Sequence, residues 1–198
     1  RDSYKGKQFS KIIVNDPLAA EQLMRRLLEK GHRNIAGVFV YDNYQSIEKY
    51  KGYVRSLRSF GAAFNDDHIK WSVSGEAHDP HFLSTLTRFI RGIPECTAIV
   101  CCNYMLLQLV LTALKTLGRR VPEDCSIVCF DYSGFDWKDQ DITCSVHPSY
   151  EIGVQAAREM LRRLDDKKQG GSTFIIDPLI HTGSSIASVS PDLTGLNG

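Results

Sequence analysis

The sequence lacks an excess of charge of either sign. Its 198 residues include 24 lysines and arginines and 23 aspartates and glutamates, which gives a formal net charge of +1 at pH 7. Domains that bind nucleic acids usually carry a strongly basic face. The composition therefore does not favour direct DNA binding by this segment, and any action on DNA is expected to require a domain absent from this chain.

Long apolar runs are also missing. No stretch reaches the roughly 18 apolar residues of a membrane-spanning helix, and the polar residues 1–10 lack the apolar core of a signal peptide. We therefore expect a soluble protein without a membrane partner, unless processing has removed an export signal.

Metal-site spacing is absent as well, although the chain has six cysteines. No CxxC pair and no Cys/His pairing of zinc type occurs. The cysteines lie in or beside apolar runs, where a thiol acts as a small buried hydrophobe. We therefore expect reduced thiols, a cytoplasmic location, and neither disulfides nor a metal site. The six are Cys96, Cys101, Cys102, Cys125, Cys129 and Cys144.

The motifs of several enzyme classes are missing too. No Gly-rich phosphate loop of the GxGxxG or GxxxxGK type follows a strand-like run, so we expect no nucleotide cofactor. Neither a GxSxG elbow nor an HExxH helix occurs. Asp42 and Asp131 remain open as an acid/base pair, although nothing in their spacing favours it. We expect a protein that is not an enzyme and that uses no cofactor.

What the chain does have is a regular alternation of strand-like and helical apolar patterns. A length of 198 residues with 42% hydrophobic content is enough for a core of ordinary size. This order predicts an α/β fold with a doubly wound parallel sheet. The expected strands cover 11–14, 34–41, 69–73, 97–102, 125–130, 142–146, 173–176 and 179–182. The expected helices cover 15–30, 46–60, 80–90, 104–117 and 148–166.

Polar residues follow the ends of these strands. They are Asp42 and Gln45 after the second strand, Asn103 after the fourth, Asp131 after the fifth and His147 after the sixth. The carboxyl ends of parallel strands meet at one edge of a sheet, where ligands bind in open α/β folds. Each residue is equally compatible with capping the following helix. Together they suit a ligand with many hydroxyl groups, such as a sugar.

Three segments resemble a known family. They are 28–35, with the motif Gly-His-Arg-Asn-Ile, then Cys102-Asn103, then 121–131, with the motif Val-Pro-Glu-Asp-x-Ser-Ile-Val. From about residue 9 to 184 the chain resembles the effector-binding domain of lactose/galactose-type bacterial transcription repressors. The resemblance implies a periplasmic-binding-protein-like fold of two similar subdomains. It also implies effector contacts at Lys49, Asn103 and Asp131.

A narrower similarity points to the arabinose-repressor branch of this family. It rests on Val38-Phe39 followed by Asp42 and Gln45, and on 145–148 before Gly153. It implies a small sugar effector, in particular a pentose such as L-arabinose, and DNA binding by a separate domain of a homodimer. Lys49 replaces the arginine usual at its position, which removes a two-pronged donor. A sugar-binding receptor of a transport system shares the architecture and remains the alternative.

The resemblance also implies how the chain is divided. Residues 1–14 end the N-terminal subdomain, 15–146 form the complete C-terminal effector-binding subdomain, and 147–176 return as a crossover helix and strand. Residues 177–184 form the last strand and 185–198 a tail. The opening units of the N-terminal subdomain are largely missing, so we expect a truncated chain.

This division leaves one apolar surface without its usual sheet. The helix over 148–166 has its apolar residues on one face, and the elements that normally cover that face are among the missing ones. An uncovered apolar face favours folding back, swapping or pairing with a second chain. We therefore expect an oligomer. The apolar residues are Ile152, Ala156, Met160, Leu161 and Leu164.

Overall fold

The computed structural model describes residues 9–132, 141–165 and 170–189. Its main sheet has six strands in the order β3-β2-β4-β5-β6-β8. All neighbouring pairs are parallel except β6 and β8, which are antiparallel, so the expected parallel sheet has one antiparallel edge. The strands are β2 (Ile35–Val40), β3 (Ile69–Ser72), β4 (Ala98–Cys101), β5 (Ser126–Tyr132), β6 (Thr143–Val146) and β8 (Leu179–His181).

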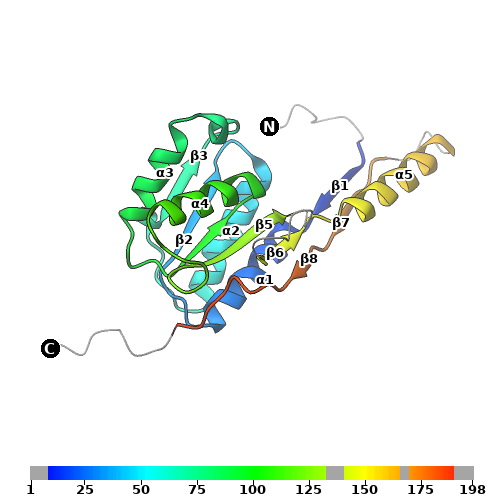
Figure 1. Ribbon diagram of the computed structural model, residues 1–198. Coiled ribbons are helices and arrows are strands. Elements are labelled where there is room, and N and C mark those ends of the chain that lie inside the picture. The colour runs from blue at the N-terminus through cyan, green and yellow to red at the C-terminus, as the bar shows by residue number, and fades with distance from the viewer. Residues whose placement is uncertain (1–8, 133–140, 166–169, 190–198) are drawn as a thin grey trace.

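Helices cover both faces of this sheet, which confirms the doubly wound α/β prediction. Helix α1 (Asp16–Glu29) packs beside α2 (Tyr44–Ser59) on one face, and α3 (Phe82–Arg91) packs beside α4 (Tyr104–Thr116) on the other (Figure 1). Two short 3-10 helices, η1 (Asp66–His68) and η2 (Glu76–His78), flank β3. Every residue of β2 and β4 is buried, as expected for strands covered on both faces.

Local sequence signals account for the first helix. The Asn15 side chain accepts a hydrogen bond from the Leu18 N–H and caps α1, with Pro17 in the first turn. Gly31, just beyond the helix, adopts a φ of +91°, a conformation that glycine reaches without steric cost. Residues Leu23, Leu27 and Leu28 are buried, as their spacing predicts.

The six cysteines are all free and buried, as the sequence predicts. Burial raises the pKa of each of these thiols above its ordinary value. A protonated, buried thiol is a poor nucleophile. All six cysteines belong to the buried core around the main sheet.

A second, smaller unit extends from one end of the main sheet (Figure 1). Strand β1 (Lys11–Val14) pairs in parallel with β7 (Thr173–Ile176), and helix α5 (Ser149–Asp165) contacts both strands. The apolar residues of α5 are uncovered among the described residues: Met160, Leu161 and Leu164 are each about 60% exposed. The sole buried residue of the helix is Glu159. The helix has not folded back onto the larger unit.

The segment after β8 is more ordered than its sequence pattern indicates. Residues 185–189 belong to a predicted tail, yet Ser185 is buried against the main sheet. Its hydroxyl donates to the Ile127 carbonyl at 2.6 Å and accepts from the Thr143 N–H at 2.9 Å. Residues 190–198 of the predicted tail lie outside the described residues.

The packing of α1 on α2 depends on one glycine, and this generates a prediction. A Cβ added at Gly52 would lie 2.4 Å from the Ala20 Cβ. Replacing a glycine inside a helix by alanine normally stabilises by about 0.5–1 kcal/mol. Here we expect Gly52→Ala to lower the free energy of unfolding by about 1–3 kcal/mol, because the two helices must separate.

Gly153 in α5 is the matched control, because a Cβ added there meets nothing within 4 Å. We expect Gly153→Ala to leave stability unchanged or to raise it by up to about 1 kcal/mol. Urea denaturation of both variants measures the difference. Equal stability of the two variants would contradict the close α1–α2 contact.

Candidate functional site

Polar residues predicted at the strand ends are brought to one edge of the main sheet. The residue pair Cys101 and Cys129 is in register between β4 and β5. Asn103 and Asp131 each lie two residues further along, so they occupy corresponding positions at the carboxyl edge. His147 directly follows Val146, the register partner of Tyr132. Asn103 and Asp131 therefore lie at corresponding positions on adjacent strands, and His147 lies at the same edge, just beyond the end of β6.

Asp131 lies at a β-bulge. Cys129 pairs with Cys144, but Tyr132 pairs with Val146, so β5 has one residue more than β6 between these pairs. Asp131 has a φ of +54° and is the sole non-glycine described residue with positive φ. Bulges re-aim side chains, and a left-handed conformation outside glycine has a steric cost that the surroundings must offset. Such strain is concentrated at functional sites.

The Asp131 carboxylate contacts the ammonium of a buried lysine. Lys49, on α2, contacts Asp131 Oδ2 directly, and its side chain is only 3% exposed. Its ammonium also donates to the Cys102 carbonyl at 3.4 Å and lies 5.4 Å from the centre of the Phe130 ring. The Asp131 side chain is 26% exposed. Lys49 therefore lies behind Asp131, and Asp131 faces the solvent side of this pair.

Asp16 is the third charged residue of this group, and the sequence did not predict it as a site residue. Its Oδ1 lies 3.8 Å from Lys49 Nζ, and its side chain is 8% exposed. Burial raises the pKa of Asp16 to about 6, Lys49 opposes the rise, and Asp131 adds to it. The segment Asn15-Asp16-Pro17 signals only a helix cap, because the partner of Asp16 is on the following helix.

The other predicted residues have local partners. Asn103 accepts from the Leu106 N–H at 2.9 Å and caps α4. Asp42 Oδ1 accepts from the Ser74 N–H at 2.8 Å, which lowers the pKa of Asp42. Gln45 is exposed in the first turn of α2, which begins two residues earlier than predicted because Asn43 caps it. His147 Nδ1 lies 2.9 Å from Ser149 Oγ.

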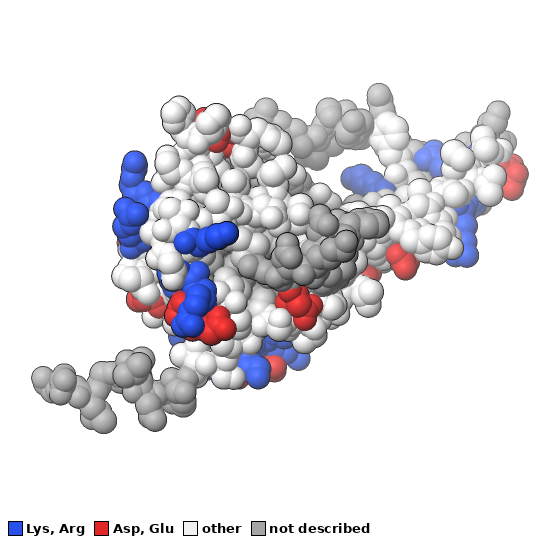
Figure 2. Space-filling model, viewed as in Figure 1, with Lys and Arg blue, Asp and Glu red and all other residues white. Residues whose placement is uncertain are grey.

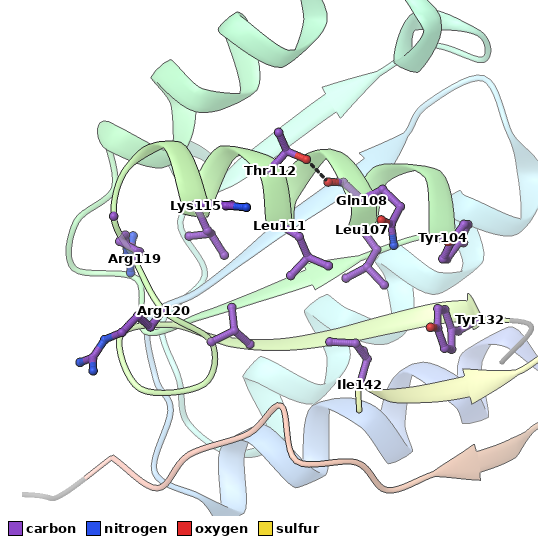
Figure 3. Close-up of a pocket in the computed structure, with 13 residues that line it drawn as sticks. Tyr104, Leu107, Gln108, Leu111, Thr112, Lys115, Arg119, Arg120, Tyr132 and Ile142 are labelled. Atoms are coloured by element: carbon purple, nitrogen blue, oxygen red, sulfur yellow. Dashed lines mark hydrogen bonds between the residues drawn. The ribbon is translucent and has the colours of Figure 1, made fainter. Parts of the chain in front are cut away.

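Two hollows lie near these residues. One has a volume of about 480 Å³, is lined by His147 among others, and lies between the end of β6 and the start of β8. A larger one of about 860 Å³ follows the side of α4, with Arg119 and Arg120 at one end and Tyr104 and Tyr132 at the other (Figure 3). The larger hollow contains none of the six predicted site residues, so we do not assign the site to it.

Charges of both signs are interspersed on the visible face of the molecule (Figure 2). This agrees with the net charge of +1. Among the described residues, no helix has the length and apolar content that crossing a membrane requires. None of the six predicted site residues belongs to the one described group with metal-ligand spacing, which is His68, Glu95 and Cys96.

The raised pKa of Asp16 generates a prediction about pH. Between about pH 4 and 6 the folded chain holds a proton on Asp16 that the unfolded chain releases, so the free energy of unfolding falls as pH rises through this window. We expect Asp16→Asn to remove this component, a difference of about 1–3 kcal/mol across the window. Urea denaturation at a series of pH values measures it.

Asp42→Asn is the control of opposite sign, because the pKa of Asp42 is lowered. Its contribution to stability is present above the unfolded pKa and is lost as pH falls through the folded pKa. Identical pH profiles for the parent and Asp16→Asn would contradict the burial of an ionisable Asp16.

Named relatives align with most of this chain. The chain is 29% identical over 175 residues to the arabinose metabolism transcriptional repressor of Halalkalibacterium halodurans, which covers 85% of this chain and 46% of the relative. It is 30% identical over 159 residues to the protein of the same name from Geobacillus stearothermophilus, covering 79% of this chain and 43% of the relative. The chain thus spans about half the length of these relatives.

Solved structures share the fold. The transcriptional regulator CelR in complex with cellobiose superimposes with a TM-score of 0.79 at 20% identity, over 90% of this chain and 54% of that one. A LacI family regulator from Enterococcus faecium with bound ribose gives 0.78 at 17% identity, over 91% and 66%. Residues 24–186 match the family described as periplasmic binding protein-like domain. The chain belongs to this periplasmic binding protein-like family.

Proposed function

We propose that this chain is the effector-sensing part of a bacterial transcription repressor and binds a small sugar at the carboxyl edge of its main sheet. The observation that carries the proposal is the geometry of Asp131. The backbone of Asp131 has a left-handed conformation at a bulge, and its carboxylate contacts the ammonium of the buried Lys49. Such an arrangement orients a hydrogen-bond acceptor toward a ligand before the ligand arrives.

The surrounding groups suit hydroxyl recognition. Asp131 would accept hydrogen bonds from sugar hydroxyls, while the side chains of Asn103, Gln45 and His147 can each donate or accept. Asp42 lies at the same edge, with one oxygen already bound to Ser74. We assign Lys49 a positioning role, because its ammonium is buried beneath Asp131.

The proposed effector is a pentose, with L-arabinose as the leading candidate. Two relatives are named as arabinose metabolism repressors, and one structural neighbour holds ribose. Another neighbour holds cellobiose, so the fold itself accommodates different sugars. The test below therefore compares pentoses with hexoses and a disaccharide.

We further propose that sugar binding acts through the connections between the two units. The chain passes from one unit to the other at Asn15, near His147 and near Asp177, and Asn15 Nδ2 donates to Asp177 Oδ1 at 2.9 Å. In this proposal residues 15–146 form the effector-binding subdomain. Residues 1–14 and 147–176 belong to the other subdomain, followed by a last strand over 177–184. A sugar that binds one relative orientation better would shift the population toward it.

The proposal assigns DNA binding to a domain outside this chain, because the segment itself is nearly neutral. It assigns no catalysis, since the named relatives are transcription regulators. It locates the protein in the cytoplasm, where the six free cysteines would stay reduced. A sugar receptor of a transport system is the second candidate, favoured by the shared architecture but not by these thiols.

The sugar proposal is tested by thermal unfolding with L-arabinose, D-ribose, D-glucose and cellobiose. We expect L-arabinose to raise the melting temperature most, because a ligand that binds only the folded chain stabilises it by mass action. Asp131→Ala is expected to abolish the shift, and Lys49→Met to reduce it, because Asp131 then loses its brace.

Asp124→Ala is the matched control at the opposite end of β5. Its carboxylate pairs with the exposed Arg120, far from the carboxyl edge. We expect this variant to keep the full sugar-induced shift. A shift that survives in Asp131→Ala would contradict the assignment of the site.

The proposed homodimer is tested by multi-angle light scattering. The exposed Met160, Leu161 and Leu164 of α5 lie beside the open-edged β1–β7 sheet, where Ile175 is also exposed. A two-fold dimer would bury this surface against its own copy. We expect the parent to be dimeric, and Leu161→Lys combined with Leu164→Lys to be monomeric.

Glu151→Lys changes charge at an exposed position of the same helix and should leave the dimer intact. A parent that stays monomeric at high concentration would refute the dimer.

A further inference from the structure

We propose that His68, Glu95 and Cys96 form a binding site for a zinc-type divalent cation at the amino edge of the main sheet. The three side chains each offer one ligand atom, and these atoms all lie within 4.8 Å of one another. His68 directly precedes β3, and Glu95 and Cys96 lie in the turn before β4. The cluster is therefore at the edge opposite to Asp131.

The backbone positions of the buried members are set by hydrogen bonds that do not involve an ion. Asn65 caps η1 through its side chain, and the His68 N–H donates to the Asn65 carbonyl at 3.1 Å. The Cys96 N–H donates to the Ile93 carbonyl at 3.1 Å, and the Cys96 carbonyl accepts from the Arg119 guanidinium at 2.9 Å. The backbone at His68 and Cys96 is therefore held by contacts within the chain.

The ligand atoms are close to the spacing that zinc requires. His68 Nε2 already lies 2.8 Å from Glu95 Oε1. Zinc bonds of about 2.0–2.3 Å to nitrogen, oxygen and sulfur place tetrahedral ligands about 3–4 Å apart. The Glu95 side chain is 48% exposed, so its carboxylate can move to admit an ion between it and the imidazole.

The chemistry of the three ligands favours zinc over calcium or magnesium. Thiolate and imidazole are preferred by zinc-type ions, while calcium and magnesium select oxygen ligands. On binding, the Cys96 S–H bond breaks, its proton passes to solvent, and a sulfur–metal bond forms. The thiolate and the Glu95 carboxylate together balance the charge of the ion. The fourth position, on the exposed side of Glu95, would be taken by water.

Such an ion would join the start of β3 to the start of β4, the two strands on either side of β2. It would act on the stability of the sheet and leave the carboxyl-edge site unchanged. The alternative is that His68 and Glu95 form an ordinary hydrogen-bonded pair and Cys96 is a core thiol. The two differ in one respect that spectroscopy detects: only a bound metal gives a metal–thiolate bond.

The test is a Co²⁺ titration of the reduced 198-residue chain, followed by absorption spectroscopy. We expect a thiolate-to-Co²⁺ charge-transfer band in the near ultraviolet and the visible bands of a tetrahedral site, all removed by added Zn²⁺. Cys96→Ser is expected to lose the charge-transfer band. Glu95→Gln changes a half-exposed residue and should weaken Co²⁺ binding by about 10-fold or more.

Matched controls come from the second histidine–carboxylate pair and another buried thiol. His181 contacts Asp141 at 2.8 Å, and Cys144 is buried in β6. His181→Gln and Cys144→Ser should both keep the spectrum and the affinity of the parent. Absence of a charge-transfer band in the parent, or its persistence in Cys96→Ser, would overturn the proposal. If Cys96→Ser does not fold, unchanged Co²⁺ affinity in Glu95→Gln would overturn it equally.

Discussion

The covering of a parallel sheet on both faces by helices is the constraint on which the rest of this structure depends. Strands β2 and β4 are buried throughout, so their side chains can only be apolar or small. Charged residues next to these two central strands therefore lie at the strand ends. Asp131 with Asn103 and His147 occupies the carboxyl edge, while His68, Glu95 and Cys96 gather at the amino edge.

At the carboxyl edge, one buried cation is shared between two carboxylates. Lys49 contacts Asp131 and lies 3.8 Å from Asp16. An unpaired ammonium at this depth would have a large desolvation cost, and the attraction to the two carboxylates offsets that cost. The bulge at Asp131 then directs one side of this group outward. The group links α1, α2 and β5, because Lys49 on α2 contacts both Asp131 on β5 and Asp16 on α1.

The smaller unit differs from the larger one in how well its apolar residues are buried. Its two strands and α5 have too few elements to bury their own apolar residues, and Leu161 and Ile175 are about 60% exposed. The chain covers about half the length of its named relatives. The larger unit has a closed core of its own, whereas the smaller one leaves large apolar side chains of α5 and β7 exposed.

The sequence by itself determined the order and type of the elements, because each one has a local cause. Apolar periodicity marks β2 and β4, Asn15 caps α1, and Gly31 ends it. It also determined that Asp131, Asn103 and His147 share an edge, since parallel strands end together. The antiparallel pairing of β8 and the burial of Ser185 had no local signal.

Only the tertiary structure decided that Asp16 joins Lys49, that Lys49 is buried behind Asp131, and that His68 meets Cys96. These contacts join residues far apart in the chain, and their free energy comes from excluding water around charges. No periodicity or spacing within one segment records that exclusion, because it arises only once the helices close over the sheet.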